Sequence, residues 1–403
     1  MNRNERDAGV ISRRHKPVIR RPSGEYLVPE IAISRRSFLW VGTAIGASLL
    51  LDRTAESASA KSGVGSGDTT LTSHSFSSPR HTTRYWEAGP TDGPLMLFVH
   101  GWPEIGLMWR AQIEAFASEG WHCVAPDMRG YGASSAPAAS GAYALSEIVQ
   151  DMVELHDHLG ARPAVWIGHD LGSPVVGALA AHHTKRSLGV VFVSVPYSPD
   201  AFALPSLLPL INRKIYPAGE YPDGQWDYYR FYLTHFDQTV TDFDADISGT
   251  LAAIYRSGNP APVDNVYPSA LVTHNGGWFG SAHRAPVIPP DSALWPAADF
   301  GALVEAFRVT GFRPGNSWYL NDTANMAYAH AASNNGRLQQ PVLFINGEFD
   351  GICDINRSRI GEPMRSTCQD LSVINLPSGH WLPLERKAES IQAIRSWLKA
   401  KRL

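Results

Sequence analysis

The sequence predicts an α/β fold, in which a mostly parallel β-sheet has helices on both faces and is interrupted by an inserted, mainly helical cap. Short apolar runs alternate with amphipathic segments over residues 80–196, and the same alternation resumes over residues 338–403. Parallel strands are buried on both faces and therefore have continuous apolar sequences, with helices in the connections. The intervening residues 197–337 are rich in Tyr, Trp, Pro and Gly without a regular strand pattern, which predicts the cap.

The composition is that of an ordinary globular protein. Of the 403 residues, 44% are hydrophobic and 18% are charged, and the net charge is -3. A chain without a basic surplus is not expected to bind nucleic acid. The three cysteines, Cys123, Cys353 and Cys368, are an odd number at wide spacing, which argues against a disulfide framework and against a zinc cluster.

The first 60 residues resemble a twin-arginine export signal. Arg35 and Arg36 lie in the segment SRRSFL, followed by an apolar stretch over residues 39–51 and a small-residue cleavage pattern, ASA, at residues 58–60. The apolar stretch is shorter than the roughly 20 residues of a bilayer span, and an uncleaved signal anchor is the alternative. The resemblance implies an exported protein, periplasmic or secreted, that meets the export machinery through its arginine pair. Residues 61–79 are rich in Ser, Gly and Thr, which predicts a flexible linker.

Apolar periodicity places the elements of the core. Residues 145–159 carry apolar side chains near helical spacing and end at Gly160, a helix terminator. A second helix is expected from about residue 174 to residue 185, and a third near the C-terminus, where Ile391, Ile394 and Leu398 share a face. Strands are expected at apolar runs bounded by turn residues, namely 84–88, 95–99, 122–125, 164–167, 190–195, 341–345 and 371–376.

The turn GHDLG at residues 168–172 lies between an expected strand and an expected helix. In α/β hydrolases the nucleophile lies on such a strand–turn–helix junction, with small residues beside it so that the backbone can close. Gly168 and Gly172 meet that requirement and make the carboxylate of Asp170 a candidate nucleophile. Taken alone, the pattern is equally consistent with an Asp that caps the following helix.

Two further residues lie just past the ends of expected strands, where ligands collect in open α/β sheets. Asp350 ends the segment NGEFD, and His380 lies in the segment PSGHW. The chain order of nucleophile, acid and histidine is that of α/β hydrolases. We therefore predict a triad in which His380 activates water while Asp350 orients the imidazole and stabilises its charged form.

The segment HGWPE at residues 100–104 directly follows the expected strand 95–99. A turn here would aim the backbone N–H of Trp102 into the site. Together with the N–H of Leu171, it would form an oxyanion hole. An ordinary Gly-Pro turn is the alternative for this stretch alone.

Together these segments resemble the epoxide hydrolases of the α/β-hydrolase fold, and the resemblance covers nearly all of residues 80–403. Two cap segments strengthen it: WDYY at residues 226–229 and GFRPGNSWY at residues 311–319. The resemblance places the two ring-opening tyrosines of that family on Tyr228 and Tyr319. Tyr229 and Tyr232 are close competitors for the first of these positions.

The resemblance implies hydrolysis of small, apolar epoxides to vicinal diols without a metal or organic cofactor. A carboxylate that attacks carbon forms an ester, which water can cleave, whereas a serine would form an inert ether. A hydrolytic dehalogenase with the same triad is the nearest alternative, but Leu171, next to the nucleophile, has no side-chain N–H for a halide. An esterase using Ser173 would need its nucleophile on the helix, away from the tip of the turn. A non-catalytic binding protein that keeps the scaffold is the third alternative.

Overall fold

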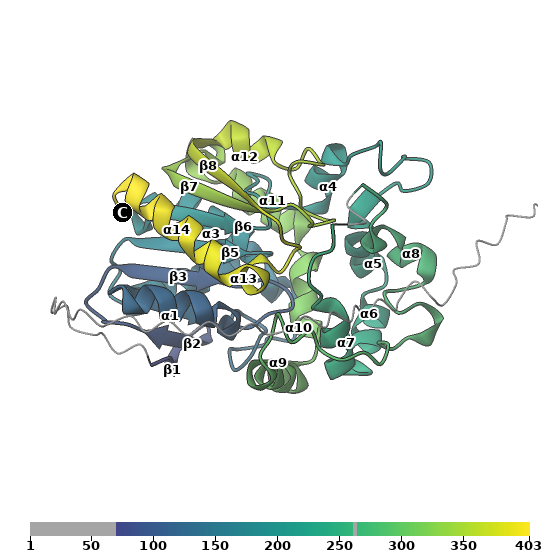
Figure 1. Cartoon of the computed structure of the whole chain (residues 1–403), viewed down its shortest axis with the longest axis horizontal. Helices are drawn as coiled ribbons and strands as arrows, with labels where there is room; N and C mark the ends of the chain where they lie inside the picture. Colours follow the sequence, from purple (N-terminus) through teal and green to yellow (C-terminus); the bar gives the residue numbers. More distant parts are fainter. Residues whose placement is uncertain (1–69, 261–263) are drawn as a thin grey trace, which may run out of the picture. The chain divides into compact units, whose positions relative to one another are not determined.

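The computed structural model describes residues 70–260 and 264–403 (Figure 1). The predicted export signal and residues 61–69 of the predicted linker lie outside these residues. The remainder of that linker prediction is wrong, because Thr72–Ser77 forms strand β1, which is antiparallel to β2. Most of its side chains are exposed. An edge strand of this kind is held by backbone pairing with its neighbour, and its sequence therefore lacks the apolar alternation that marks a half-buried strand.

The core is an eight-stranded sheet in the order β1-β2-β4-β3-β5-β6-β7-β8. The first two strands run antiparallel, and the six strands from β4 to β8 in this order are parallel. Each expected apolar run coincides with a strand of this sheet or overlaps one, and the central runs are buried over their whole length. The strands are β2 (Thr82–Ala88), β3 (Leu95–Val99), β4 (His122–Pro126), β5 (Ala164–His169), β6 (Ser187–Val193), β7 (Leu338–Gly347) and β8 (Cys368–Leu376).

Helices cover both faces of the sheet, as predicted. Helices α1 and α14 pack against each other in front of the sheet in Figure 1, while α2 packs against α3, which follows β5. The buried side of α2 carries the apolar residues that predicted it, among them Ile148, Met152 and Leu155. The core helices are α1 (Arg110–Ser118), α2 (Leu145–His158), α3 (Gly172–His182), α12 (Glu362–Thr367), α13 (Leu382–Glu385) and α14 (Lys387–Lys401).

Between β6 and β7 the described residues form α-helices and 3-10 turns without a strand. This segment contacts the carboxyl end of the sheet: the ring of Trp102, three residues past β3, packs on the rings of Tyr232 and Tyr319. No helix among the described residues combines the length and the apolar character needed to cross a membrane. The helices are α4 (Leu204–Leu207), α5 (Asp227–Thr234), α6 (Phe236–Asp244), α7 (Ile247–Ile254), α8 (Val272–Asn275), α9 (Ala297–Thr310), α10 (Arg313–Asn316) and α11 (Asp322–His330).

Candidate active site

Asp170 lies at the tip of a sharp turn between β5 and α3. Its φ is 48°, in the left-handed region that residues with a Cβ rarely adopt. Close packing requires glycine on both sides: a Cβ on Gly168 would lie 2.5 Å from the carbonyl oxygen of Gly172, and one on Gly172 would lie 2.3 Å from the carbonyl oxygen of Val99. The carboxylate faces Trp102 and His380 instead of capping the helix that follows it. The turn therefore holds the carboxylate of Asp170 in the position expected of a nucleophile in an α/β hydrolase.

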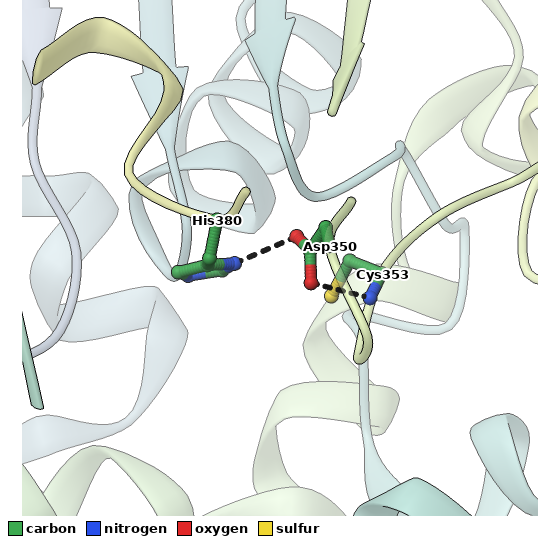
Figure 2. A group of neighbouring side chains, drawn as sticks. All are labelled: Asp350, Cys353 and His380. Carbon is green, nitrogen blue, oxygen red and sulfur yellow. Dashed lines mark hydrogen bonds and ion pairs between the residues drawn. The ribbon is translucent and has the colours of Figure 1, made fainter. Parts of the chain in front are cut away.

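The structure brings the three predicted triad residues together. His380 places Nδ1 2.8 Å from Oδ2 of Asp350, the contact drawn in Figure 2, and Nε2 3.3 Å from Oδ2 of Asp170. Asp350 follows β7 and His380 follows β8, two neighbouring strands whose carboxyl ends meet at one edge of the sheet. Oδ1 of Asp350 accepts the backbone N–H groups of Ile352 and Cys353, at 2.9 and 3.0 Å. These bonds hold the carboxylate of Asp350 in place, and the carboxylate in turn orients the imidazole of His380.

The charges of the triad depend on one another. Burial by itself would raise the pKa of Asp170, but the hydrogen bond and the charge of His380 hold the pKa of this carboxyl below its ordinary value. Burial by itself would lower the pKa of His380, but the charges of Asp350 and Asp170 and the hydrogen bonds to both raise it well above its ordinary value. At neutral pH the free site is therefore an ion pair, with an anionic Asp170 beside an imidazolium.

The backbone N–H of Trp102 donates to Oδ1 of Asp170 at 2.7 Å. A Cβ on Gly101 would lie 2.4 Å from the same Oδ1 and 2.5 Å from the backbone nitrogen of Leu171, so glycine is required for this close approach. Of the two N–H groups of the predicted oxyanion hole, that of Trp102 thus contacts the nucleophile, and the backbone nitrogen of Leu171 packs against the same glycine. The indole Nε1 of Trp102 donates to Asn316 at 2.7 Å, which holds this residue in place.

Both predicted ring-opening tyrosines come from the cap and are buried. Tyr228 lies on α5 and Tyr319 on the 3-10 turn Ser317–Leu320, with the two rings edge to face at 6.1 Å. Burial raises the pKa of both phenols well above the ordinary value, and the charge of Asp170 raises each further. Both hydroxyls are therefore protonated at neutral pH and able to donate.

The competitors of Tyr228 are engaged elsewhere. The hydroxyl of Tyr229 donates to Oδ1 of Asp322 at 2.5 Å. The hydroxyl of Tyr232 accepts the indole N–H of Trp278 at 2.9 Å. Tyr228 is therefore the better candidate for the first proton donor, because in the described part of the chain its hydroxyl neither donates to a carboxylate nor accepts from an indole.

A second buried pair lies directly behind the triad, and the sequence interpretation gave it no role. Nδ1 of His169 lies 2.7 Å from Oε1 of Glu104, and both side chains are fully buried. Nε2 of His169 contacts the carbonyl oxygen of His380 at 2.8 Å, while Oε2 of Glu104 accepts the N–H of Gly101 at 2.5 Å. The pair thus ties the oxyanion loop to the loop of the catalytic histidine. The visible signal was that Glu104 and His169 lie within the two motifs HGWPE and GHDLG.

A cavity of about 30 Å³ lies next to Leu171, the residue that follows Asp170. Leu171 and Tyr319 both line it, so it borders the oxyanion hole and a candidate proton donor. Its other walls are mainly apolar or aromatic and include Val175, Phe202 and Trp318. Such walls suit a small apolar group.

Comparison with known proteins agrees with this fold. The sequence matches the family model of the alpha/beta hydrolase fold over residues 94–387. It is 31% identical to Epoxide hydrolase A of Mycobacterium tuberculosis over 78% of this chain and 93% of the relative, and 30% identical to Epoxide hydrolase B of the same organism over 76% and 91%. The crystal structure of Epoxide Hydrolase A from Mycobacterium thermoresistibile matches with a TM-score of 0.66 at 27% identity, over 82% of this chain and 98% of that one.

The parallel sheet and the strained turn between β5 and α3 define an α/β hydrolase, with Asp170, Asp350 and His380 as its candidate triad. The extent of the sequence matches defines it further: the chain belongs to the α/β-hydrolase fold family and, within it, to the epoxide hydrolases.

Proposed function

We propose that the protein hydrolyses small, apolar epoxides to vicinal diols through an ester on Asp170. One observation carries this proposal: the carboxylate of Asp170 contacts the oriented imidazole of His380, and its charge also acts on two buried, protonated tyrosines. Opening an epoxide needs a nucleophile at carbon and a proton donor at the ring oxygen, because an alkoxide is a poor leaving group. These residues supply both functions.

In the first step, Oδ2 of Asp170 attacks a ring carbon and the carbon–oxygen bond breaks. The electron pair goes to the ring oxygen, which takes a proton from Tyr228 or Tyr319 and leaves a tyrosinate. The ester carries no charge, so His380 loses the charge and the hydrogen bond of Asp170 that raised its pKa. The imidazolium then gives its proton to the tyrosinate and becomes a neutral base.

In the second step, His380 takes a proton from water and the hydroxide attacks the ester carbonyl. Trp102 and Leu171 stabilise the tetrahedral oxyanion through their N–H groups, each contributing on the order of 3 kcal/mol. Collapse releases the diol and restores the ion pair between Asp170 and His380. Ester formation thus favours the histidine as a base, since Asp350 and Asp170 both raise its pKa beforehand and the contribution of Asp170 is lost in the ester.

The surroundings of the nucleophile favour epoxide over halide. A halide leaving group needs N–H donors, and Leu171 supplies none from its side chain. The indole N–H of Trp102 is nearby but already donates to Asn316. The hydroxyls of Tyr228 and Tyr319 instead suit an oxygen that must be protonated.

Tyr319→Phe and Tyr228→Phe are each expected to slow ring opening by roughly 100-fold while sparing ester hydrolysis, since a positioned general acid contributes about 10²- to 10⁴-fold and one donor remains. Single-turnover mixing, with the ester quantified by mass spectrometry, separates the two steps. Tyr232→Phe is the matched control, because it removes a buried hydroxyl from the same helix and should change ring opening less than about twofold. A loss confined to ester hydrolysis would contradict the assigned role.

We also propose that residues 1–60 are a twin-arginine export signal and that the protein acts in the periplasm or outside the cell. Support comes from the arginine pair, the apolar stretch and the ASA pattern. Replacing Arg35 and Arg36 by Lys is expected to leave full-length protein in the cytoplasm of a bacterial host that has this export route. The same change at Arg13 and Arg14 is the control and should not affect export. Fractionation and N-terminal sequencing measure the outcome, and export that persists in the first variant overturns the proposal.

A further inference from the structure

Cys353 lies beside the acid and the histidine of the triad (Figure 2). One ligand atom from each of Asp350, Cys353 and His380 lies within 4.8 Å of the other two. Cys353 is 1% exposed and its backbone is tied to Oδ1 of Asp350, so the side chain starts from a fixed position. The wide spacing of the cysteines argued against a zinc cluster, and no metal was expected from the sequence. The fold instead surrounds a single cysteine with a carboxylate and an imidazole.

We propose that Asp350, Cys353 and His380 form an inhibitory binding site for a borderline-soft divalent cation such as Zn²⁺ or Cd²⁺. Thiolate, imidazole and carboxylate are the ligands that Zn²⁺ takes in proteins, at about 2.0–2.3 Å, and three of them with a water complete a tetrahedron. Tetrahedral ligand atoms at such distances are roughly 3.5 Å apart, so the present spacing of at most 4.8 Å closes with small side-chain rotations. Mg²⁺ and Ca²⁺ prefer oxygen ligands and are not expected to bind here.

Of the three ligands, His380 is the one with an exposed part, on the side of the nucleophile. The side chain of His380 is 17% exposed and that of Asp170 is 10% exposed. The side chain of Asp350 and the residue Cys353 are each 1% exposed, so a cation reaches them past His380. Two of the three ligands, the Cys353 thiolate and the Asp350 carboxylate, carry negative charge when bound and together balance the charge of a divalent ion.

Binding would disable the histidine without touching the nucleophile. The cation replaces the proton of the Cys353 thiol and the Nδ1 proton of His380 that faces Asp350, and both protons go to solvent. Nε2 keeps its proton and faces Asp170. An imidazole with a cation on Nδ1 and a proton on Nε2 cannot accept a proton from water. On the proposed function, on which this consequence rests, the cation permits ester formation and blocks ester hydrolysis.

Binding is tested first, without reference to activity. Titration of the full chain with Cd²⁺ is expected to produce the ultraviolet charge-transfer absorption of a cadmium–thiolate bond, saturating at one equivalent per chain. Cys353→Ser is expected to lose that absorption and to weaken Zn²⁺ binding by more than about tenfold, since even outer-shell partners of a ligand contribute about 10- to 100-fold. Cys368→Ser, which changes another buried cysteine, is the control and should bind as the parent does.

Activity is tested second, with each variant compared with its own zinc-free rate. In Zn²⁺ the parent is expected to consume about one equivalent of epoxide and to retain it as an ester on Asp170, whereas Cys353→Ser continues to turn over; Mg²⁺ should have no effect. Equal sensitivity of the two proteins to Zn²⁺, or a block before ester formation, overturns the proposal. If the parent binds Cd²⁺ through Cys353 yet consumes no epoxide even without metal, the site stands and the proposed function fails.

Discussion

Asp170→Asn is expected to lower kcat for epoxide hydrolysis by about 10⁴- to 10⁶-fold, the scale of losses seen when a nucleophile is removed from a catalytic triad. The amide cannot form the ester, and the carboxylate that pairs with His380 is lost with it. The measurement is initial diol formation at saturating epoxide. Because an asparagine beside activated water can hydrolyse back to aspartate, Asp170→Ala is measured in parallel and should show the same loss.

Ser173→Ala is the control for this experiment. Ser173 lies in the first turn of α3, where its hydroxyl donates to the carbonyl oxygen of Gly168 at 3.0 Å. Its replacement is expected to leave kcat within about twofold. If this variant lost activity while Asp170→Ala kept it, a serine-dependent mechanism would replace the one proposed.

His380→Gln is expected to turn the enzyme into one that reacts once and stops. Ring opening does not need a base, so the ester still forms, but its hydrolysis should slow by at least about 10³-fold because the general base is missing. Intact-protein mass spectrometry should show an increase equal to the mass of one epoxide, and peptide mapping should place it on Asp170.

A distant histidine serves as the control. His182 is half-buried near the end of α3, and its Nε2 contacts the carbonyl oxygen of Tyr328. His182→Gln is expected to turn over normally without accumulating ester. If His380→Gln formed no ester at all, His380 would be required for ring opening, contrary to the division of the two steps.

The sequence predicts those site residues that lie directly after an expected strand. Asp170, Asp350 and His380 each come just after an apolar run, and parallel strands bring such positions to one edge. Trp102 was recognisable for the same reason, because it follows β3. The distances that make these residues a triad depend on strand order, which a single sequence does not state.

Other features depend on contacts between segments far apart in the chain. The pairing of Glu104 with His169 arises because β3 and β5 are neighbours in the sheet, although β4 lies between them in sequence. The choice of Tyr228 over its neighbours depends on Asp322 and Trp278, which occupy the other hydroxyls. The strand β1 was taken for linker, because an exposed edge strand carries little apolar pattern.

The most direct test of the covalent mechanism is a single turnover in water labelled with oxygen-18, with enzyme in excess over epoxide. If hydroxide attacks the ester carbonyl, the new oxygen remains with the enzyme and the diol leaves with an oxygen that belonged to Asp170. The predicted result is therefore one labelled oxygen in the carboxylate of Asp170 and an unlabelled diol. Label in the diol after one turnover, with Asp170 unlabelled, would show that water attacks the epoxide directly and would contradict the ester intermediate.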